Sequence, residues 1–239
     1  MIMKYKLTDE TMTINSGVLL HRIECVECFG SVKEGDIGGW IEREENLSQL
    51  CDCWVYGNAR VSGNARVYGN AEVSGDAKVS GNAQVYGDAE VSDNARVYGD
   101  AEVCSNARVY GYAEVYGNAQ VYGDALVYED AEVYSNARVS GNALVSGNAR
   151  VYGDALVSGN AIIGNSNDYI VFKNNWSSGR YFTWTRSNDM WRVGCFYGTG
   201  KELIEKAYKD SNLSGDCYKA YVELVEKLKD VFEKQQQKQ

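Results

Sequence analysis

Proline is absent from this chain of 239 residues, although an average chain carries about 5 % proline. Its absence excludes collagen-like and polyproline segments. Phenylalanine is scarce, with 5 residues against 18 tyrosines, so most aromatic side chains carry a polar end. Basic residues are also fewer than acidic ones, 24 against 33. The formal net charge is −9, whereas a protein held to nucleic acid by phosphate contacts is expected to carry the opposite sign.

Long apolar runs are missing as well. None is long enough to cross a membrane, and the first ten residues, MIMKYKLTDE, lack the apolar segment of a signal peptide. Seven cysteines in a chain without an export signal are most simply reduced thiols. We therefore expect a cytoplasmic protein that does not contact membranes.

What the sequence has instead is a six-residue repeat. Valine stands at every sixth position from Val55 to Val157, which makes 18 valines without a gap, and Ile163 continues the series. The unit reads V-[YS]-G-[ND]-A-x. It suits a short strand, whose alternation points Ala and Val inward, followed by a corner where Gly and Asn or Asp accept left-handed backbone angles. Three corners close a triangular coil, so the repeats predict about six stacked coils of parallel strands.

The unit resembles the hexapeptide repeat of left-handed parallel β-helix proteins, and the left-handed sense is implied by that resemblance. The segments VKEGDIGGWI at 32–41, NLS at 46–48 and DCWVY at 52–56, with GCF-x-GT at 194–199, are more specific. They resemble a family of hexapeptide-repeat proteins common in phages and prophages of gut bacteria, of which a distant enterobacterial relative carries a transferase name. For a phage-encoded chain, the resemblance implies the cytoplasm of the host bacterium.

The fold class expected is mainly β, with three parts. Residues 1–52 should form a small N-terminal β cap, because an uncovered end coil is a template for edge pairing. The left-handed parallel β-helix then occupies 53–163, and a small C-terminal α+β domain occupies 164–239. In that last domain we expect three strands and two amphipathic helices, the first opened by a capping box of Thr199 and Glu202. The three strands are expected at 169–172, 180–185 and 190–196.

Side chains that follow the core valines point outward and form ladders at intervals of 18 residues. One face carries an unbroken ladder of Tyr98, Tyr116, Tyr134 and Tyr152. Two interpretations stay open. The tyrosines either shield the sheet and supply cross-strand pairing, or form a recognition surface, because tyrosine gives contact area at low entropic cost. We take the ladder as the candidate protein-binding surface.

An apolar strip marks the last coils. Leu126, Leu144 and Ile162 follow one another on one face, and Leu156 lies on the adjoining face. Such a strip should be covered, either by the C-terminal domain or by another subunit. Because hexapeptide-repeat relatives are commonly trimers, we expect a homo-oligomer, either a trimer or a dimer.

The charge of the repeat suggests a further possibility, mimicry of DNA. Residues 53–163 carry 7 basic and 13 acidic side chains. However, Arg60, Lys78, Arg96 and Arg150 interrupt one ladder, with Glu114 and Glu132 between them, and mixed sign is typical of an ordinary solvated face. Nucleic acid is therefore not an expected partner.

Catalytic residues are hard to find. Acyltransferases with hexapeptide repeats depend on a histidine base at a subunit interface and a loop extruded from the coils. Here the single histidine, His21, precedes the repeat, and no hexad carries an insertion. We therefore expect no enzymatic activity and no cofactor.

Four cysteines have a superficial resemblance to a zinc site: Cys25, Cys28, Cys51 and Cys53. Cys53 occupies an inward Ala position of the repeat, so buried reduced thiols are favoured and no metal is expected. Cys104 replaces an outward Tyr or Ser and should be an exposed thiol.

The C-terminal domain holds a second candidate site. Thr199 and Lys201 stand at a helix start, where free backbone N–H groups can hold a phosphate, although capping alone is the simpler interpretation. Arg180, Thr183 and Trp184 lie in a neighbouring strand and would complete a nucleotide pocket.

The sequence thus favours a non-enzymatic, phage-type binding protein that sequesters or inhibits a host factor, with a defence protein as the most economical choice. A sponge for a nucleotide second messenger, bound at the C-terminal domain, is the first alternative. The others are a DNA-mimic inhibitor and a hexapeptide acyltransferase.

Overall fold

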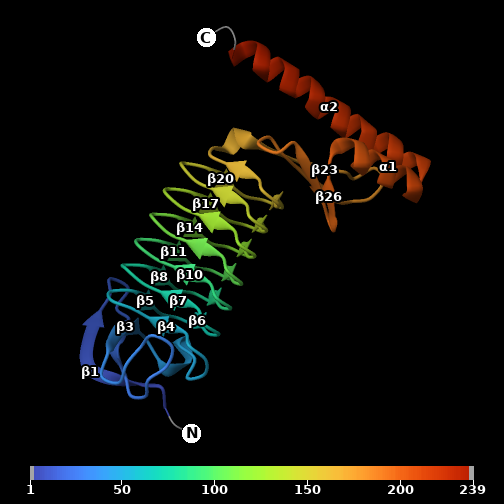
Figure 1. The fold of residues 1–239 in the computed structure, drawn as a ribbon. Helices are drawn as coiled ribbons and strands as arrows, with labels where there is room; N and C mark the ends of the chain where they lie inside the picture. The colour runs from blue at the N-terminus through green and yellow to red at the C-terminus, as the bar shows by residue number, and fades with distance from the viewer. Residues whose placement is uncertain (1–2, 237–239) are drawn as a thin grey trace. The chain divides into compact units, whose positions relative to one another are not determined.

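A computed structural model describes residues 3–236 of the chain. The chain divides into two compact units, Met1–Ser166 and Asn167–Gln239. The first unit is a parallel β-solenoid of about seven turns, and Figure 1 shows its coils stacked from β3 to β20. The predicted class, a mainly β parallel solenoid with an α+β part after it, is confirmed. Its left-handed sense rests on the resemblance.

Each coil contributes one short strand to each of three faces. The first face contains β3 (Ile37–Ile41), β5 (Arg60–Val61), β8 (Lys78–Val79), β11 (Arg96–Val97), β14 (Glu114–Val115), β17 (Glu132–Val133) and β20 (Arg150–Val151). The second contains β4 (Trp54–Val55), β7 (Glu72–Val73), β10 (Glu90–Val91), β13 (Arg108–Val109), β16 (Leu126–Val127), β19 (Leu144–Val145) and β22 (Ile162–Ile163). The third contains β6 (Arg66–Val67), β9 (Gln84–Val85), β12 (Glu102–Val103), β15 (Gln120–Val121), β18 (Arg138–Val139) and β21 (Leu156–Val157).

The hexad explains this arrangement. Val97 pairs in parallel with Val79 on one side and Val115 on the other, so identical positions lie above one another at intervals of one coil. The repeat valines and alanines are all fully buried and form the interior column. The corner after each valine takes a positive φ, as predicted. Even the four residues that replace glycine there adopt it: Asp93, Ser105, Glu129 and Ser135.

The solenoid begins one coil earlier than the repeat predicts. Ile41 pairs in parallel with Val61, and Leu47 forms a bridge with Val67, so the stack has about seven turns instead of six. These pairs are 20 residues apart, because two extra residues lie between Leu47 and Val55, whereas the corner between Ile41 and Leu47, formed by the 3-10 turn η1 (Glu44–Asn46), keeps the usual length. The two extra residues take the apolar positions out of the six-residue phase. The buried Asn46 replaces the corner by donating to the carbonyls of Gly63 and Ala65, at 3.1 and 2.8 Å.

The N-terminal cap consists of β-strands, as predicted, and these pair in antiparallel fashion and extend the first face. Strands β1 (Tyr5–Thr13) and β2 (Leu19–Cys25) form a hairpin that pairs with β3. Figure 1 shows this hairpin against the first coils. Tyr5 is fully buried, and its hydroxyl donates to the carbonyl of Leu47 at 2.7 Å.

The second unit has four antiparallel strands rather than the three expected, in the order β23-β24-β25-β26 after the turn η2 (Ser166–Asp168). The strands are β23 (Tyr169–Lys173), β24 (Tyr181–Thr185), β25 (Met190–Val193) and β26 (Phe196–Gly198). The third predicted strand is divided in two, because Gly194 adopts a φ of 56° and reverses the chain between β25 and β26.

Two helices pack on this sheet, α1 (Gly200–Asp210) and α2 (Asn212–Gln236). The predicted capping box opens α1, since the Thr199 hydroxyl accepts from the backbone N–H of Glu202. The core between helices and sheet consists of Phe182, Trp184, Trp191, Val193, Leu203, Ala207, Tyr218, Val222 and Val225. Among residues 3–236, no helix has the length and apolarity needed to cross a membrane.

Candidate functional site

The four predicted tyrosines form a continuous stack along the first face. Ring centroids are 4.9 Å apart between Tyr98 and Tyr116, 4.9 Å between Tyr116 and Tyr134, and 5.3 Å between Tyr134 and Tyr152. The rings are nearly parallel, with interplanar angles of 1°, 2° and 13°. We call this stack the tyrosine ladder. Three of its members are half-buried, and Tyr152 is 50 % exposed.

Two glutamates fix the ladder in place. The Tyr98 hydroxyl donates to Glu114 Oε2 at 2.8 Å, and the Tyr116 hydroxyl donates to Glu132 Oε2 at 2.9 Å. Burial and the hydrogen bond to the anionic Glu114 raise the pKa of Tyr98 to about 12. The same two causes, with Glu132 as acceptor, raise the pKa of Tyr116. Each tyrosine therefore stays neutral and donates over the whole physiological range.

The glutamates are held in turn by arginines. Arg96 Nη1 lies 2.8 Å from Glu114 Oε1, and Arg150 Nε lies 3.1 Å from Glu132 Oε1. The sequence analysis placed Glu114 and Glu132 in the ladder of mixed charge and missed their hydrogen bonds to the tyrosines. The signal was present, because each glutamate follows its tyrosine by 16 residues, which places it one coil later on the same face.

A shallow groove of about 970 Å³ runs beside the ladder on this face. Outward side chains of the strands and of one row of corners line it: Arg60, Asp76, Lys78, Asn94, Arg96, Tyr112, Glu114, Asp130, Glu132 and Asn148. Cations gather toward the early coils and anions toward the later ones. Tyr112 is 65 % exposed at the corner row. Glu114 and Glu132 line the groove and also accept hydrogen bonds from the ladder hydroxyls. The groove and the ladder therefore form one surface with aromatic and charged parts.

Shorter stacks stand on the other faces. Tyr68 and Tyr86 lie 4.8 Å apart on the third face, and Tyr110 and Tyr128 lie 5.2 Å apart on the second. Cys104, expected to be exposed, is half-buried. The neighbouring Cys104 thiol and burial raise the pKa of Tyr86, whose hydroxyl donates to Glu102 Oε2 at 3.4 Å.

The apolar strip is assembled as its spacing predicts. Leu144 pairs with Leu126 on one side and Ile162 on the other, in parallel register on the second face. Leu156 lies on the third face, in β21. Leu126, Leu144 and Leu156 are half-buried, and Ile162 is 51 % exposed.

The structure does not bring together the five residues expected to form a nucleotide pocket. Arg180 precedes β24, whereas Trp184 lies near the other end of that strand, a separation of about 13 Å at the usual rise per residue. Thr183 alternates with the core residues Phe182 and Trp184 and so points away from them.

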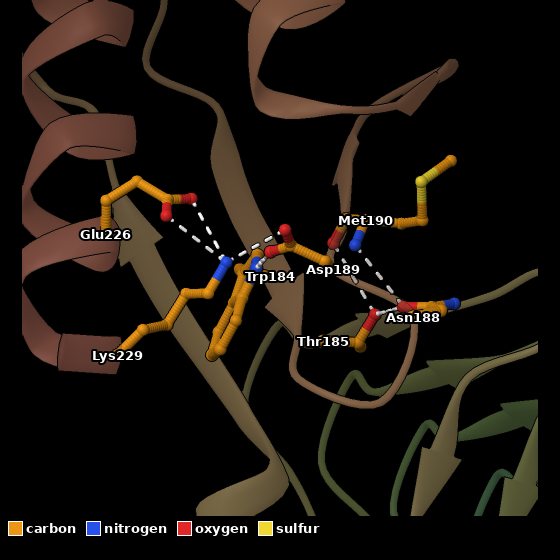
Figure 2. Close-up of polar contacts among 7 residues, drawn as sticks. All are labelled: Trp184, Thr185, Asn188, Asp189, Met190, Glu226 and Lys229. Carbon is orange, nitrogen blue, oxygen red and sulfur yellow. Dashed lines mark hydrogen bonds and ion pairs between the residues drawn. The ribbon is translucent and has the colours of Figure 1, made fainter. Parts of the chain in front are cut away.

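Trp184 is engaged in a separate polar cluster. Its indole N–H donates to Asp189 Oδ1 at 2.8 Å, and Lys229 Nζ lies 2.8 Å from Asp189 Oδ2 (Figure 2). Lys229 also pairs with Glu226 from the same helix, at 3.2 Å. These contacts connect α2 to the β24–β25 turn. Trp184 therefore has a structural role in this unit.

A carboxylate of the protein itself occupies the start of α1. The Glu202 carboxylate accepts from the backbone N–H of Thr199 at 2.8 Å and from its hydroxyl at 2.9 Å, and both bonds lower the pKa of Glu202. Lys201 is exposed and pairs with Glu205 at 4.0 Å. The Glu202 carboxylate therefore occupies the position at the helix start where the sequence analysis expected a phosphate.

Two of the four cysteines considered for a zinc site, Cys51 and Cys53, contact Lys4. Cys53 is fully buried, as predicted, and Lys4 donates to its carbonyl at 2.8 Å, to its thiol at 3.4 Å and to the carbonyl of Cys51 at 3.1 Å. Burial lowers the pKa of Lys4 and raises that of the Cys53 thiol. All seven cysteines are free. In the described part of the chain, no three His, Cys, Asp or Glu side chains are arranged to hold a metal ion.

His21 lies in β2, half-buried, opposite Thr11 on one neighbouring strand and Ile41 on the other. It does not line the groove of the first face.

Comparison with known proteins identifies the repeat. A family pattern described as "YdcK Beta solenoid repeat" matches residues 55–69, 59–75, 83–99, 119–135, 137–153 and 149–165. One similar protein is the "Uncharacterized acetyltransferase YdcK" of Escherichia coli (strain K12), which is 36 % identical over 78 residues. The similarity covers 27 % of this chain and 24 % of that relative, so the chain matches about a quarter of the relative's length.

Proposed function

We propose that this protein, whose solenoid belongs to a YdcK-related repeat family, is a non-enzymatic binding protein that recognises a protein partner through the tyrosine ladder. The partner we propose is a factor of the bacterial host, and a defence protein is the most economical choice given the resemblance to phage proteins. Binding of this kind would sequester or inhibit that factor.

The observation that carries the proposal is the ordered ladder beside a groove of mixed charge. Binding energy at protein interfaces is concentrated in a few aromatic and arginine anchors. Ladder rings held by Glu114 and Glu132 lose little conformational entropy when a partner docks. The charged groove supplies polar contacts at the rim, which favour one partner over others.

The competing function is acyl transfer, which the relative's printed name suggests. A histidine base would have to be His21, and this residue lies in the hairpin of the first coils rather than along the groove. The strands from β4 to β22 follow one another every six residues, so no loop leaves the coils to build a pocket.

The test is affinity purification from a bacterial lysate followed by binding measurements with the purified partner. We expect the double variant Tyr116→Ala/Tyr134→Ala to weaken binding at least about tenfold, as loss of central aromatic anchors does. The matched control is Tyr68→Ala/Tyr86→Ala, which removes an equivalent stack from another face and should leave affinity unchanged. Arg180→Ala should also bind normally. Full affinity in the Tyr116/Tyr134 variant would refute the proposal.

A calorimetric titration with acetyl-CoA tests the competing function. We expect no saturable binding and no effect of His21→Ala on partner binding. Saturable binding with turnover that His21→Ala abolishes would establish the acyltransferase instead.

A further inference from the structure

Helix α2 has two apolar faces, and only one of them belongs to the core of the C-terminal unit. The first includes Tyr218, Val222 and Val225, which are buried in that core. The second, which we call the outer face, consists of six residues: Leu213, Cys217, Ala220, Leu224, Leu228 and Val231. Its four large members, the three leucines and Val231, are 42 to 60 % exposed. The helix therefore presents more apolar surface than its own unit buries.

The outer face is one continuous strip. Its members follow one another at intervals of three or four residues, so at 3.6 residues per turn they lie within about 80° around the helix axis. At a rise of 1.5 Å per residue, the strip is about 27 Å long. No charged residue between positions 213 and 231 falls inside it. An uncharged apolar strip with this spacing is typical of a helix that packs against a second helix.

Charged residues along one edge of the outer face change sign halfway along the helix. Asp216 and Glu223 lie on this edge in the first half of α2. Lys227 and Lys234 follow on the same edge in the second half, and all four side chains are exposed. An edge that is acidic in one half and basic in the other is complementary to itself when two copies of the helix run antiparallel.

The apolar residues fit such an antiparallel pair in one register. When Leu224 is placed opposite Leu224 of a second copy, Cys217 faces Val231 and Ala220 faces Leu228. Each layer then joins two apolar side chains, and the small Ala220 makes room for a leucine. The register that aligns the two strips is therefore defined by the sequence of α2.

The charged edge fits the same register. Glu223 of one copy and Lys227 of the other differ in height by about 3 Å, at 1.5 Å per residue, and Asp216 and Lys234 differ by the same amount. Side chains of this length reach across that offset, so each ion pair forms twice by symmetry. In a parallel pair the charged edge would lie against the opposite edge of the second copy, and that edge is uncharged. It consists of Ser214, Tyr221 and Phe232.

We propose that two copies of this chain associate through the outer faces of their α2 helices, which run antiparallel about a two-fold axis at Leu224. A two-fold interface uses the same surface on both copies and closes on itself, so association through α2 alone gives a dimer. The outer face belongs to the second unit and is separate from the apolar strip of the solenoid. This contact is also independent of the tyrosine ladder.

Disulfide formation in the full-length protein tests the register. We expect Val231→Cys to form a disulfide with the native Cys217 of a second copy when the protein is oxidised with diamide, and peptide mass spectrometry identifies the linked residues. Within one chain these two positions are about 21 Å apart along the helix. A disulfide joins Cα atoms less than about 7 Å apart, so the bond can only connect two copies. Glu233→Cys, an exposed position on the other side of α2, is the control and should not link to Cys217.

Reciprocal charge changes test the direction of the pair. In the Val231→Cys background, Glu223→Lys should raise the protein concentration for half-maximal disulfide formation about tenfold, because two attractive pairs become repulsive. Adding Lys227→Glu should restore the original value, since the charges are then exchanged on both copies. Circular dichroism checks that the helix content is retained. No 217–231 disulfide in Val231→Cys would overturn the proposal and leave the outer face to a different protein. An equal yield of the link to Cys217 in Glu233→Cys, or no rescue by Lys227→Glu, would overturn it as well.

Discussion

The left-handed backbone at each coil corner is the strictest requirement on a single residue in this fold. At Gly75, with a φ of 66°, an added Cβ would lie 2.8 to 2.9 Å from backbone atoms of Asp93 in the next coil. At Gly153, with a φ of 68°, an added Cβ would meet nothing within 4 Å. The two positions share the conformational demand and differ only in the contact with the neighbouring coil.

This difference predicts unequal effects of the same substitution. Gly153→Ala should lower the free energy of unfolding by about 1 kcal/mol, the cost of left-handed alanine. Gly75→Ala should cost about 2 kcal/mol more, because two coils must separate locally. Urea unfolding followed by circular dichroism measures both. Equal losses would show that the corner strain alone matters.

At the scale of the element, the tyrosine ladder makes the stability of the solenoid depend on pH. The folded pKa of Tyr98, about 12, lies above the value near 10 of an unfolded tyrosine. A raised pKa means that the stabilisation is complete below about pH 10 and is lost as pH rises through the folded pKa near 12. The solenoid should therefore lose stability in alkali and not in the neutral range.

Glu114→Gln tests the cause of this shift. Removing the anionic acceptor should lower the pKa of Tyr98, so less stability is lost above about pH 10 and the loss is complete at a lower pH. Tyrosinate absorbance, with Tyr98→Phe to assign the signal, gives the pKa. Glu72→Gln, on the second face, is the control. An unchanged Tyr98 titration in Glu114→Gln would attribute the shift to burial alone.

For the whole molecule, the apolar strip of Leu126, Leu144, Leu156 and Ile162 bears on assembly. We expect the 26.5 kDa chain to form a homo-oligomer in which this strip is covered. Leu144→Glu places a charge in the middle of the strip, so it should lower the sedimentation mass or the melting temperature.

The control for assembly is Arg66→Glu, an exposed position on the third face that pairs with the neutral Gln84, which should change neither quantity. If wild type and Leu144→Glu sediment as monomers with the same melting temperature, the strip is ordinary exposed surface.

Much of the fold follows from the sequence, because the hexad is a local rule. Strand alternation buries Ala and Val, and each corner needs a positive φ. Because the coils stack, this pattern recurs every 18 residues. The ladders of Tyr98 to Tyr152 and Leu126 to Ile162 could therefore be predicted from residue spacing alone. The same rule failed at the first coil, where Asn46 replaces a standard corner and two extra residues follow Leu47.

The C-terminal unit, in contrast, contains a pocket of about 460 Å³ whose existence could not be predicted from the sequence. Arg180, Lys206 and Tyr218 lie on a strand end and two helices, and no period relates them, so only the packing of α1 and α2 on the sheet brings them to one cavity. Thr199 and Lys201 are near Lys206 in sequence but belong to the capped start of α1. Periodic contacts are fixed by residue spacing, whereas contacts between elements depend on how their apolar faces pack.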